Sequence, residues 1–238
     1  MRGLSSVVKS IGVLAGLAVA SGCGVNFYAG RPGDVKRIHE LAAQIEQLRQ
    51  QKEAENQQLR EAKALLEERL RKEIGSQQVR LEMEERGLVL TFVAEVLFDS
   101  GKAKVRPEAN ETLSKVAGVI QEKVSDRKIG IEGHTDNEPI KHSGWKSNWE
   151  LSTARATSVL HFLEEQGVNP RLMVASGYGE HNPVIANDSL EGRRKNRRVE
   201  IVILPKQLTK GEKALLKQAA SSDELGVAEK ASALEAYK

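Results

Sequence analysis

Two oppositely charged side chains, Asp136 and Arg155, stand where this sequence could form a binding site. Asp136 follows residues 129–133, in which isoleucine alternates with glycine and glutamate as in a half-buried strand. Open α/β sheets bind ligands at the carboxyl ends of their strands. Arg155 falls on or beside the apolar stripe of the next predicted helix, where a guanidinium is costly unless an acidic group meets it. One fixed anion beside one fixed cation suits a zwitterion, with an ammonium and a carboxylate on one carbon.

The helix that carries Arg155 has recognisable start and stop signals. Ser147 and Glu150 have the spacing of a capping box, which predicts a helix from about Asn148 to a stop at Gly167. A strand end and a helix start therefore bring the two charges to the same end of the domain. The apolar stripe of this helix consists of Leu151, Ala154, Val159, Phe162 and Leu163.

Four motifs, in the right order, resemble those of the OmpA-like peptidoglycan-binding domain. They are GHTD, NWELSTARA, GYGEHNP and GRRKNRRVEI, and the resemblance covers residues 79–204. In that family the Asp of the first motif and the Arg of the LSxxRA helix clamp the free amino acid end of diaminopimelate in a stem peptide. The resemblance therefore implies this role for Asp136 and Arg155, and it implies that Asn148 lines the same pocket. The implied partner is peptidoglycan.

Two further segments resemble the MotB-like branch of this family. One is LFDSGKAKVRPEA at residues 97–109, and the other is DNEPIKHSGWKSNWELS, which contains a longer insert between Asp136 and the helix. The longer insert implies a different loop over the pocket, whereas the roles implied for Asp136 and Arg155 are unchanged by it.

The composition bounds the domain organisation. The 238 residues are 29% charged and 4% aromatic, so few large apolar side chains are available for one large core. This composition favours a compact domain of roughly 100–150 residues with an extended helix. Arg2 and Lys9 supply two of the basic residues, so without residues 1–22 the chain has 34 bases against 33 acids. This balance gives no reason to expect nucleic acid as a partner. The one cysteine cannot form an internal disulfide.

Residues 1–22 have the make-up of a secretory signal peptide. A basic start precedes an apolar run at 11–20, which is shorter than the ~20 residues that a membrane span needs. The sequence ASGC at residues 20–23 resembles a bacterial lipobox. The resemblance implies that Cys23 carries acyl chains such as palmitate and anchors the protein to a membrane, and Gly24 favours the periplasmic face of the outer membrane. The alternative is an ordinary cleaved signal with an incidental cysteine.

A spacer separates this end from the domain. Residues 23–33 are rich in glycine and are predicted to form a flexible linker. Residues 34–76 are predicted to form a long helix. Lys52 and Glu55 fall in its a/d seam and weaken the middle of any coiled coil. The spacer is either a homo-oligomeric coiled coil or a solitary charged helix stabilised by side-chain pairs. The apolar seam positions are Ile38, Leu41, Ile45, Leu48, Leu59, Ala62 and Leu66.

The remainder of the chain alternates predicted strands and helices. This order favours an α/β (α+β) sandwich, with a mixed β-sheet and two main helices packed on one face. The domain is predicted to extend over 77–205, and residues 206–238 are predicted to form a helical or disordered tail. Besides 129–133, strands are expected at 79–83, 88–93, 173–176 and 198–204, and the first main helix follows Pro107.

Three other kinds of site are not favoured. His134 and Asp136 are two residues apart, but zinc usually needs three or four convergent ligands, so we predict no metal and no cofactor. No carboxylate is placed against a nucleophile, so we predict no enzymatic activity. The basic run at 192–198 lacks interleaved aromatic residues and is interpreted as a solvated loop instead of a nucleic-acid patch. An arginine of this run could also help to hold the pocket.

The sequence thus predicts a non-enzymatic lipoprotein of the outer membrane that binds diaminopimelate-containing peptidoglycan and tethers the envelope to it. The alternatives are a flagellar-stator component of the MotB type, a Tol-Pal-like envelope component, and a purely structural coiled-coil lipoprotein. A stator subunit would need a transmembrane helix with a proton-carrying acid, and we expect none from the sequence.

Overall fold

The computed structural model describes residues 32–141, 143–206, 210–212 and 214–215. The predicted signal peptide, Cys23, His142 and most of the predicted linker and tail lie outside the described residues. From Ala42 onward the described residues form one compact unit. None of the described helices is both long enough and apolar enough to cross a membrane.

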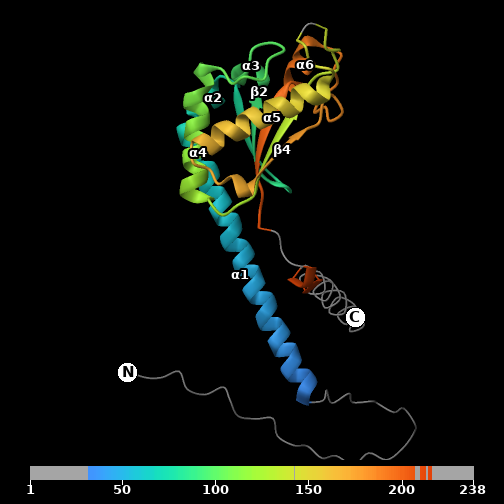
Figure 1. Cartoon of the computed structure of the whole chain (residues 1–238). Helices are drawn as coiled ribbons and strands as arrows, with labels where there is room; N and C mark the ends of the chain where they lie inside the picture. The colour runs from blue at the N-terminus through green and yellow to red at the C-terminus, as the bar shows by residue number, and fades with distance from the viewer. Residues whose placement is uncertain (1–31, 142, 207–209, 213, 216–238) are drawn as a thin grey trace, which may run out of the picture. The chain divides into compact units, whose positions relative to one another are not determined.

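A five-stranded mixed sheet forms the centre of this unit (Figure 1). Its spatial order is β1-β2-β5-β3-β4, and every neighbouring pair is antiparallel except β3 and β4, which run parallel. The sheet confirms the predicted mixed architecture, and each strand lies where the alternation of the sequence predicts one. The strands are β1 (Val79–Glu84), β2 (Gly87–Val93), β3 (Ile129–His134), β4 (Met173–Gly177) and β5 (Arg198–Ile203).

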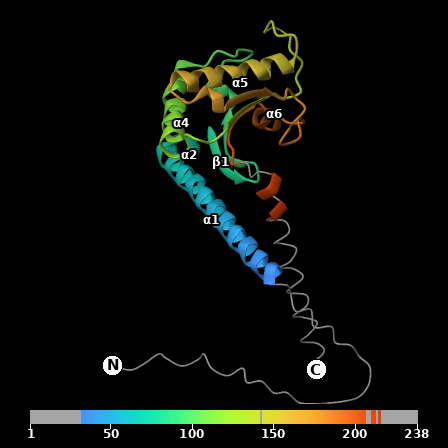
Figure 2. The ribbon, with the colours of Figure 1, turned by 60° about the horizontal axis from the view of Figure 1, so that its bottom comes forward.

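Two main helices, α4 (Asn110–Lys123) and α5 (Asn148–Glu165), cover one face of the sheet (Figure 1, Figure 2). Alternate strand residues, such as Leu90, Ile131 and Ile201, share one core with both helices and therefore point to that face. This arrangement is the predicted one. The shorter segments are α2 (Arg71–Gly75), α3 (Ala94–Leu97), α6 (Leu190–Asn196) and the 3₁₀ turns at Pro107–Ala109 and Pro170–Leu172.

The long helix α1 (Pro32–Arg69) contributes its C-terminal part to the core of the domain. The core therefore extends into the range predicted as a separate spacer. The reason is that seam positions predicted to face a partner helix pack against α4 and the sheet instead, so they are not free to form a coiled coil. The residues concerned, each at most 1% exposed, are Leu59, Ala62, Leu66 and, one turn later, Leu70.

A buried arginine joins α1 to the loop between α4 and β3. The Arg127 side chain is fully buried, and its Nη2 donates a hydrogen bond to Gln58 Oε1 at 2.7 Å. Its Nη1 lies 3.9 Å from a carboxylate oxygen of Glu55. A buried guanidinium needs such partners, because an unpaired charge in the interior is costly. Glu55 interrupts the predicted a/d seam, and its carboxylate lies beside Arg127 of the same chain.

The opposite face of the sheet carries a compact group of charges. Glu132 and Glu200 are direct antiparallel partners in β3 and β5, a position in which like charges repel. Arg86, in the turn between β1 and β2, donates through Nη1 to Glu132 at 2.6 Å and through Nη2 to Glu200. Arg198 Nε donates to Glu200 Oε1 at 2.6 Å. Two guanidinium groups thus balance two carboxylates, which makes the burial of Glu200 tolerable.

Candidate functional site

Helix α5 begins and ends at the predicted signals. The backbone N–H of Trp149 donates to Ser147 Oγ at 3.1 Å, and the Ser147 hydroxyl donates to the Glu150 carboxylate. Just beyond the other end, Gly167 has a φ of +91°, a left-handed conformation that glycine adopts readily. The capping contacts fix the first turn of α5 and, through it, the position of Arg155 two turns later.

Two glycines allow α5 to lie directly against the sheet. A Cβ at Gly133 of β3 would stand 2.1 Å from the carbonyl oxygen of Ser152, and one at Gly177 of β4 would stand 2.1 Å from Thr153 Oγ1. No side chain fits at either distance, so both positions require glycine. The strand continues through Gly133 to His134, one residue beyond the predicted range. The close approach places the first turns of α5 beside the carboxyl end of β3.

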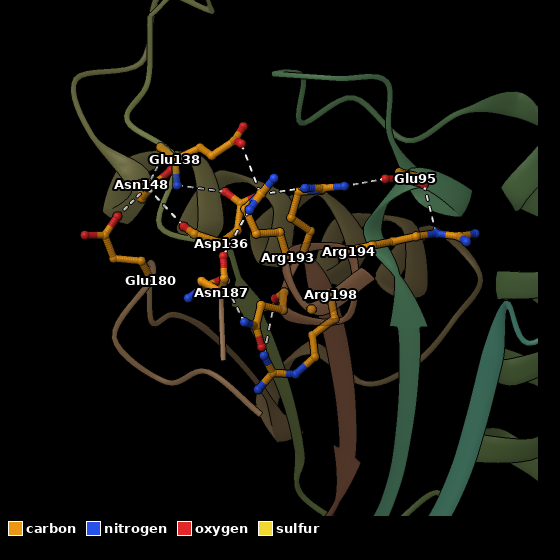
Figure 3. Close-up of polar contacts among 12 residues, drawn as sticks. Glu95, Asp136, Glu138, Asn148, Glu180, Asn187, Arg193, Arg194 and Arg198 are labelled. Carbon is orange, nitrogen blue, oxygen red and sulfur yellow. Dashed lines mark hydrogen bonds and ion pairs between the residues drawn. The ribbon is translucent and has the colours of Figure 1, made fainter. Parts of the chain in front are cut away.

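A cleft of about 640 Å³ opens at this end of the sheet. Asp136, Asn148 and Arg155 all line it, although each residue is only 5–7% exposed. Three residues predicted for one pocket therefore lie around one cleft. The rest of the lining comes from the neighbouring Thr135 and Leu151, from the segment after β2, from the insert that follows Asp136, and from α6 and the residue after it. Figure 3 shows Asp136 and Asn148 surrounded by polar contacts with these segments.

Arg155 is a buried cation with free hydrogen-bonding capacity. Its Nε donates to the backbone carbonyl of Lys102 at 2.9 Å, and its guanidinium lies 5.2 Å from the centre of the Phe98 ring. Within the part of the chain that the structure describes, neither Nη atom has a hydrogen-bond partner, and no carboxylate forms an ion pair with it. Burial, aided by the nearby charge of Arg197, lowers the pKa of Arg155 to about 10. The group remains protonated at neutral pH and is ready to bind an anion.

Asp136 already has two partners inside the protein. Its Oδ1 accepts a hydrogen bond from the backbone N–H of Glu138 at 3.2 Å, and its Oδ2 accepts one from Arg197 Nη1 at 2.5 Å. Arg197 Nη2 also donates to Glu95 Oε1 at 2.7 Å. Arg197 belongs to the basic run, of which one arginine was expected to help hold the pocket, but the sequence did not single it out. Asp136 is therefore a partly neutralised anion, not a free one.

Asn148 fixes the backbone around Asp136. Its Nδ2 donates to the carbonyl oxygens of Asp136 at 3.3 Å and Glu138 at 3.1 Å, and to Glu180 Oε2 at 2.6 Å (Figure 3). The amide group has only two N–H bonds to share among these three acceptors. Asn148 thus lines the cleft as the resemblance implied, but its described contacts hold the polar turn after β3 in place.

The longer insert forms one wall of the cleft. Pro139, Ile140 and Lys141 of this insert line the cavity. Near the end of the insert, Trp145 Nε1 donates to the carbonyl oxygen of Gly101 at 2.9 Å. This hydrogen bond attaches the insert to the segment that also supplies the Lys102 carbonyl to Arg155. The two loops over the cleft are therefore held together.

The interpretation of the basic run as a solvated loop is wrong. Residues 190–196 form helix α6, capped by Ser189 Oγ, which accepts a hydrogen bond from the backbone N–H of Gly192 at 3.0 Å. The arginines of this run pair with acids around the cleft, as Arg193 does with Glu138 at 3.1 Å and Arg194 with Glu95 at 3.2 Å (Figure 3). These contacts balance the charges of both arginines within the protein.

The described residues contain one group with potential metal ligands, on the opposite face of the sheet. The ligand atoms of Glu132, His134 and Glu200 lie within 4.8 Å of one another. Both carboxylates already pair with guanidinium groups, so a metal ion would have to displace them. His134 stacks on Tyr178 with ring centres 5.0 Å apart, and burial, together with the charge of Arg198, lowers its pKa to about 4. This neutral, stacked histidine does not line the cleft.

Comparison with known proteins gives a relative for most of the described chain. The profile of the OmpA family matches residues 97–197. Motility protein B of Bacillus subtilis is 38% identical over 156 residues, which cover 65% of this chain and 59% of that protein. The chain therefore spans less than two thirds of the length of this curated relative.

Solved structures share both sequence and fold with the domain. The crystal structure of a MotB-like protein from Desulfovibrio vulgaris superposes with a TM-score of 0.59 at 28% identity, over 67% of this chain and 99% of that one. The cell wall anchor of the T6SS from Pseudomonas aeruginosa superposes with a TM-score of 0.55 at 34% identity, over 59% of this chain and 97% of that one. The chain therefore belongs to the OmpA family and carries an OmpA-like peptidoglycan-binding domain of the MotB-like type.

Proposed function

We propose that this chain is a non-enzymatic lipoprotein that tethers a bacterial envelope membrane to peptidoglycan by binding the free amino acid end of diaminopimelate. The observation that carries the proposal is Arg155, a buried guanidinium that lines the same cleft as Asp136 and whose terminal nitrogens have no hydrogen-bond partner among the described residues. A carboxylate is the group that best satisfies two parallel N–H donors. The ammonium on the same carbon would then approach Asp136.

The partners of Asp136 leave room for that ammonium. An ionised carboxylate offers about four lone-pair sites, of which the Glu138 N–H and Arg197 occupy two. Two unit charges at ~4 Å attract by about 4 kcal/mol at an effective dielectric constant of ~20, but the cost of removing the charged groups of the protein and the ligand from water offsets much of this attraction. Binding at one site is therefore expected to be weak. Attachment to the wall would gain strength from many stem peptides and from more than one copy of the chain.

Removing the guanidinium should release the protein from peptidoglycan. We expect Arg155→Met, which keeps most of the apolar stem, to reduce co-sedimentation with purified sacculi about tenfold or more, since hydrogen bonds to charged groups contribute ~1.5–3 kcal/mol. Asp136→Asn should weaken co-sedimentation in the same direction. The matched control is Arg171→Met, because Arg171 is exposed and does not line the cleft. Undiminished co-sedimentation of a folded Arg155→Met protein contradicts the proposal.

The membrane anchor is proposed from the lipobox at Cys23. Because Cys23 is the one cysteine of the chain, Cys23→Ser removes every thiol that could be acylated. We expect this variant to lose palmitate labelling and to move from the outer-membrane fraction to the soluble fraction of the periplasm, since the acyl chains supply most of the membrane affinity. The check is fractionation on a density gradient beside the wild-type protein. Retention of the variant in the membrane fraction contradicts a lipid anchor.

A second candidate function is the wall-binding component of a larger membrane machine. It is favoured by the insert after Asp136 and by the similarity to Motility protein B and to the cell wall anchor of the T6SS. The same gradient separates the two functions. Wild-type protein in the outer-membrane fraction supports the tether, whereas protein in the inner-membrane fraction supports the machine component.

A further inference from the structure

The acids that line the cleft are all neutralised by bases of the protein. This matters because in the proposed function, on which the following inference rests, one of these acids, Asp136, accepts the ammonium of the ligand only through its remaining lone pairs. Each lining acid has a basic nitrogen within 4 Å in the described part of the chain. The pairs are Glu95 with Arg194 and Arg197, Asp99 with Lys102, Asp136 with Arg197, and Glu138 with Arg193.

The bases that line the cleft are not balanced in the same way. Of the three, Arg197 is committed to acids. Arg155 and Lys141 have no acidic partner among the described residues. The charge that remains available to a ligand is therefore positive and belongs to two separate groups. One zwitterionic amino acid end brings a single carboxylate and leaves one of these two cations unmatched.

The two cations occupy different parts of the cleft. Arg155 is buried, donates a hydrogen bond to the Lys102 carbonyl and packs over the Phe98 ring. Lys141 is exposed and stands on the insert, whose end is attached to Gly101 through Trp145. At about 640 Å³, the cleft falls in the range of roughly 300–1,000 Å³ that holds ligands larger than one amino acid. It has room for the neighbour of the residue bound by Arg155.

We propose that the cleft recognises a stem peptide through two carboxylates, one bound by Arg155 and a second bound by Lys141 of the insert. The first belongs to the free amino acid end of diaminopimelate. The second belongs to an adjoining residue of the same peptide, either the α-carboxylate of its γ-linked D-glutamate or the terminal carboxylate of its D-alanine. Lys141 is thereby a specificity-determining residue that distinguishes free from amidated stem peptides.

The test uses purified full-length protein and three synthetic peptides. The first is L-Ala-γ-D-Glu-meso-diaminopimelate-D-Ala with every carboxylate free, the second is amidated at the D-glutamate α-carboxylate, and the third at the terminal D-alanine. We expect Lys141→Gln to weaken binding of the free peptide roughly two- to fivefold in calorimetric titration, the range for an exposed ion pair. Amidation of the group that Lys141 binds should weaken wild-type binding by the same factor and should not affect the variant.

The controls separate this inference from the proposed function. Lys146→Gln changes another exposed lysine of the same insert that does not line the cleft, and it should leave all three affinities unchanged. Arg155→Met should weaken binding of all three peptides about tenfold or more. If Lys141→Gln weakens all three equally, or if neither amidation weakens wild-type binding, the second carboxylate contact is overturned while the role of Arg155 stands. If Arg155→Met binds the three peptides as tightly as the wild-type protein does, the proposed function itself fails.

Discussion

A chain that begins at Gln77 should lose most of the folding free energy of a chain that begins at Ala42. The truncation removes three leucines of α1 and the segment after it, Leu59, Leu66 and Leu70, each at most 1% exposed. Burying a leucine contributes ~1.5–3 kcal/mol, so their removal costs about 5–9 kcal/mol, comparable to the ~5–15 kcal/mol that stabilises a whole domain. Urea denaturation followed by tryptophan fluorescence measures the difference.

A single substitution in the longer chain checks the same contact without truncation. Leu66→Ala should lower the free energy of unfolding by about 2–5 kcal/mol, as in other fully buried leucine sites. The chain that begins at Ala42 keeps all three of these leucines and serves as the reference. Equal urea midpoints for the chains from Ala42 and Gln77 would show that α1 is a detachable spacer, contrary to the structure.

The second large effect is expected from one methyl group at Gly133. We expect Gly133→Ala to lower the free energy of unfolding by about 3 kcal/mol and to weaken peptidoglycan binding, because overpacking a tight contact costs ~1–3 kcal/mol or more. The new Cβ would stand 2.1 Å from the Ser152 carbonyl oxygen and 2.9 Å from its carbon. These are backbone atoms, so the strain is relieved only by moving α5, which carries Arg155.

Gly130→Ala is the matched control, since Gly130 lies in the same strand. A Cβ there would meet nothing closer than 3.7 Å, and the atoms it meets belong to side chains. Glycine weakens a strand interior by roughly 0.5–1 kcal/mol relative to alanine, so Gly130→Ala should be neutral or slightly stabilising. Chemical denaturation of both variants gives the comparison. Equal stability of the two would mean that α5 does not pack on Gly133 as the structure shows.

Local signals in the sequence were sufficient to predict most of the fold. The alternation at Ile129 and Ile131 predicts β3, and the Ser147 and Glu150 spacing predicts the start of α5, because both depend on residues close in the chain. The meeting of Asp136 and Arg155 in one cleft was also predictable, because a strand end and a helix start determine it. Their ligand stays a prediction.

Long-range partners could not be predicted in this way. Arg197 pairs with Asp136 across 61 residues of sequence, and nothing in the basic run distinguishes it from its neighbours. Helix α6 has only seven residues, and its glycine, Gly192, lowers its helix propensity, so it carries a weak signal. The heptad pattern of α1 correctly indicates an apolar stripe, but the pattern does not say whether a second chain or the chain's own domain covers that stripe.

The contact of Arg127 with α1 has a mechanical consequence for the membrane-to-wall tether that we propose. Arg127 stands just before β3, and Asp136 stands just after it. Besides the covalent path from α1 through α2 into β1, this contact would carry part of a force applied through α1 to the amino end of β3, while the resisting force of a bound wall peptide would act at its carboxyl end. Because β3 lies between β5 and β4, both of its ladders would be sheared along their length, so many hydrogen bonds would have to break together instead of one after another.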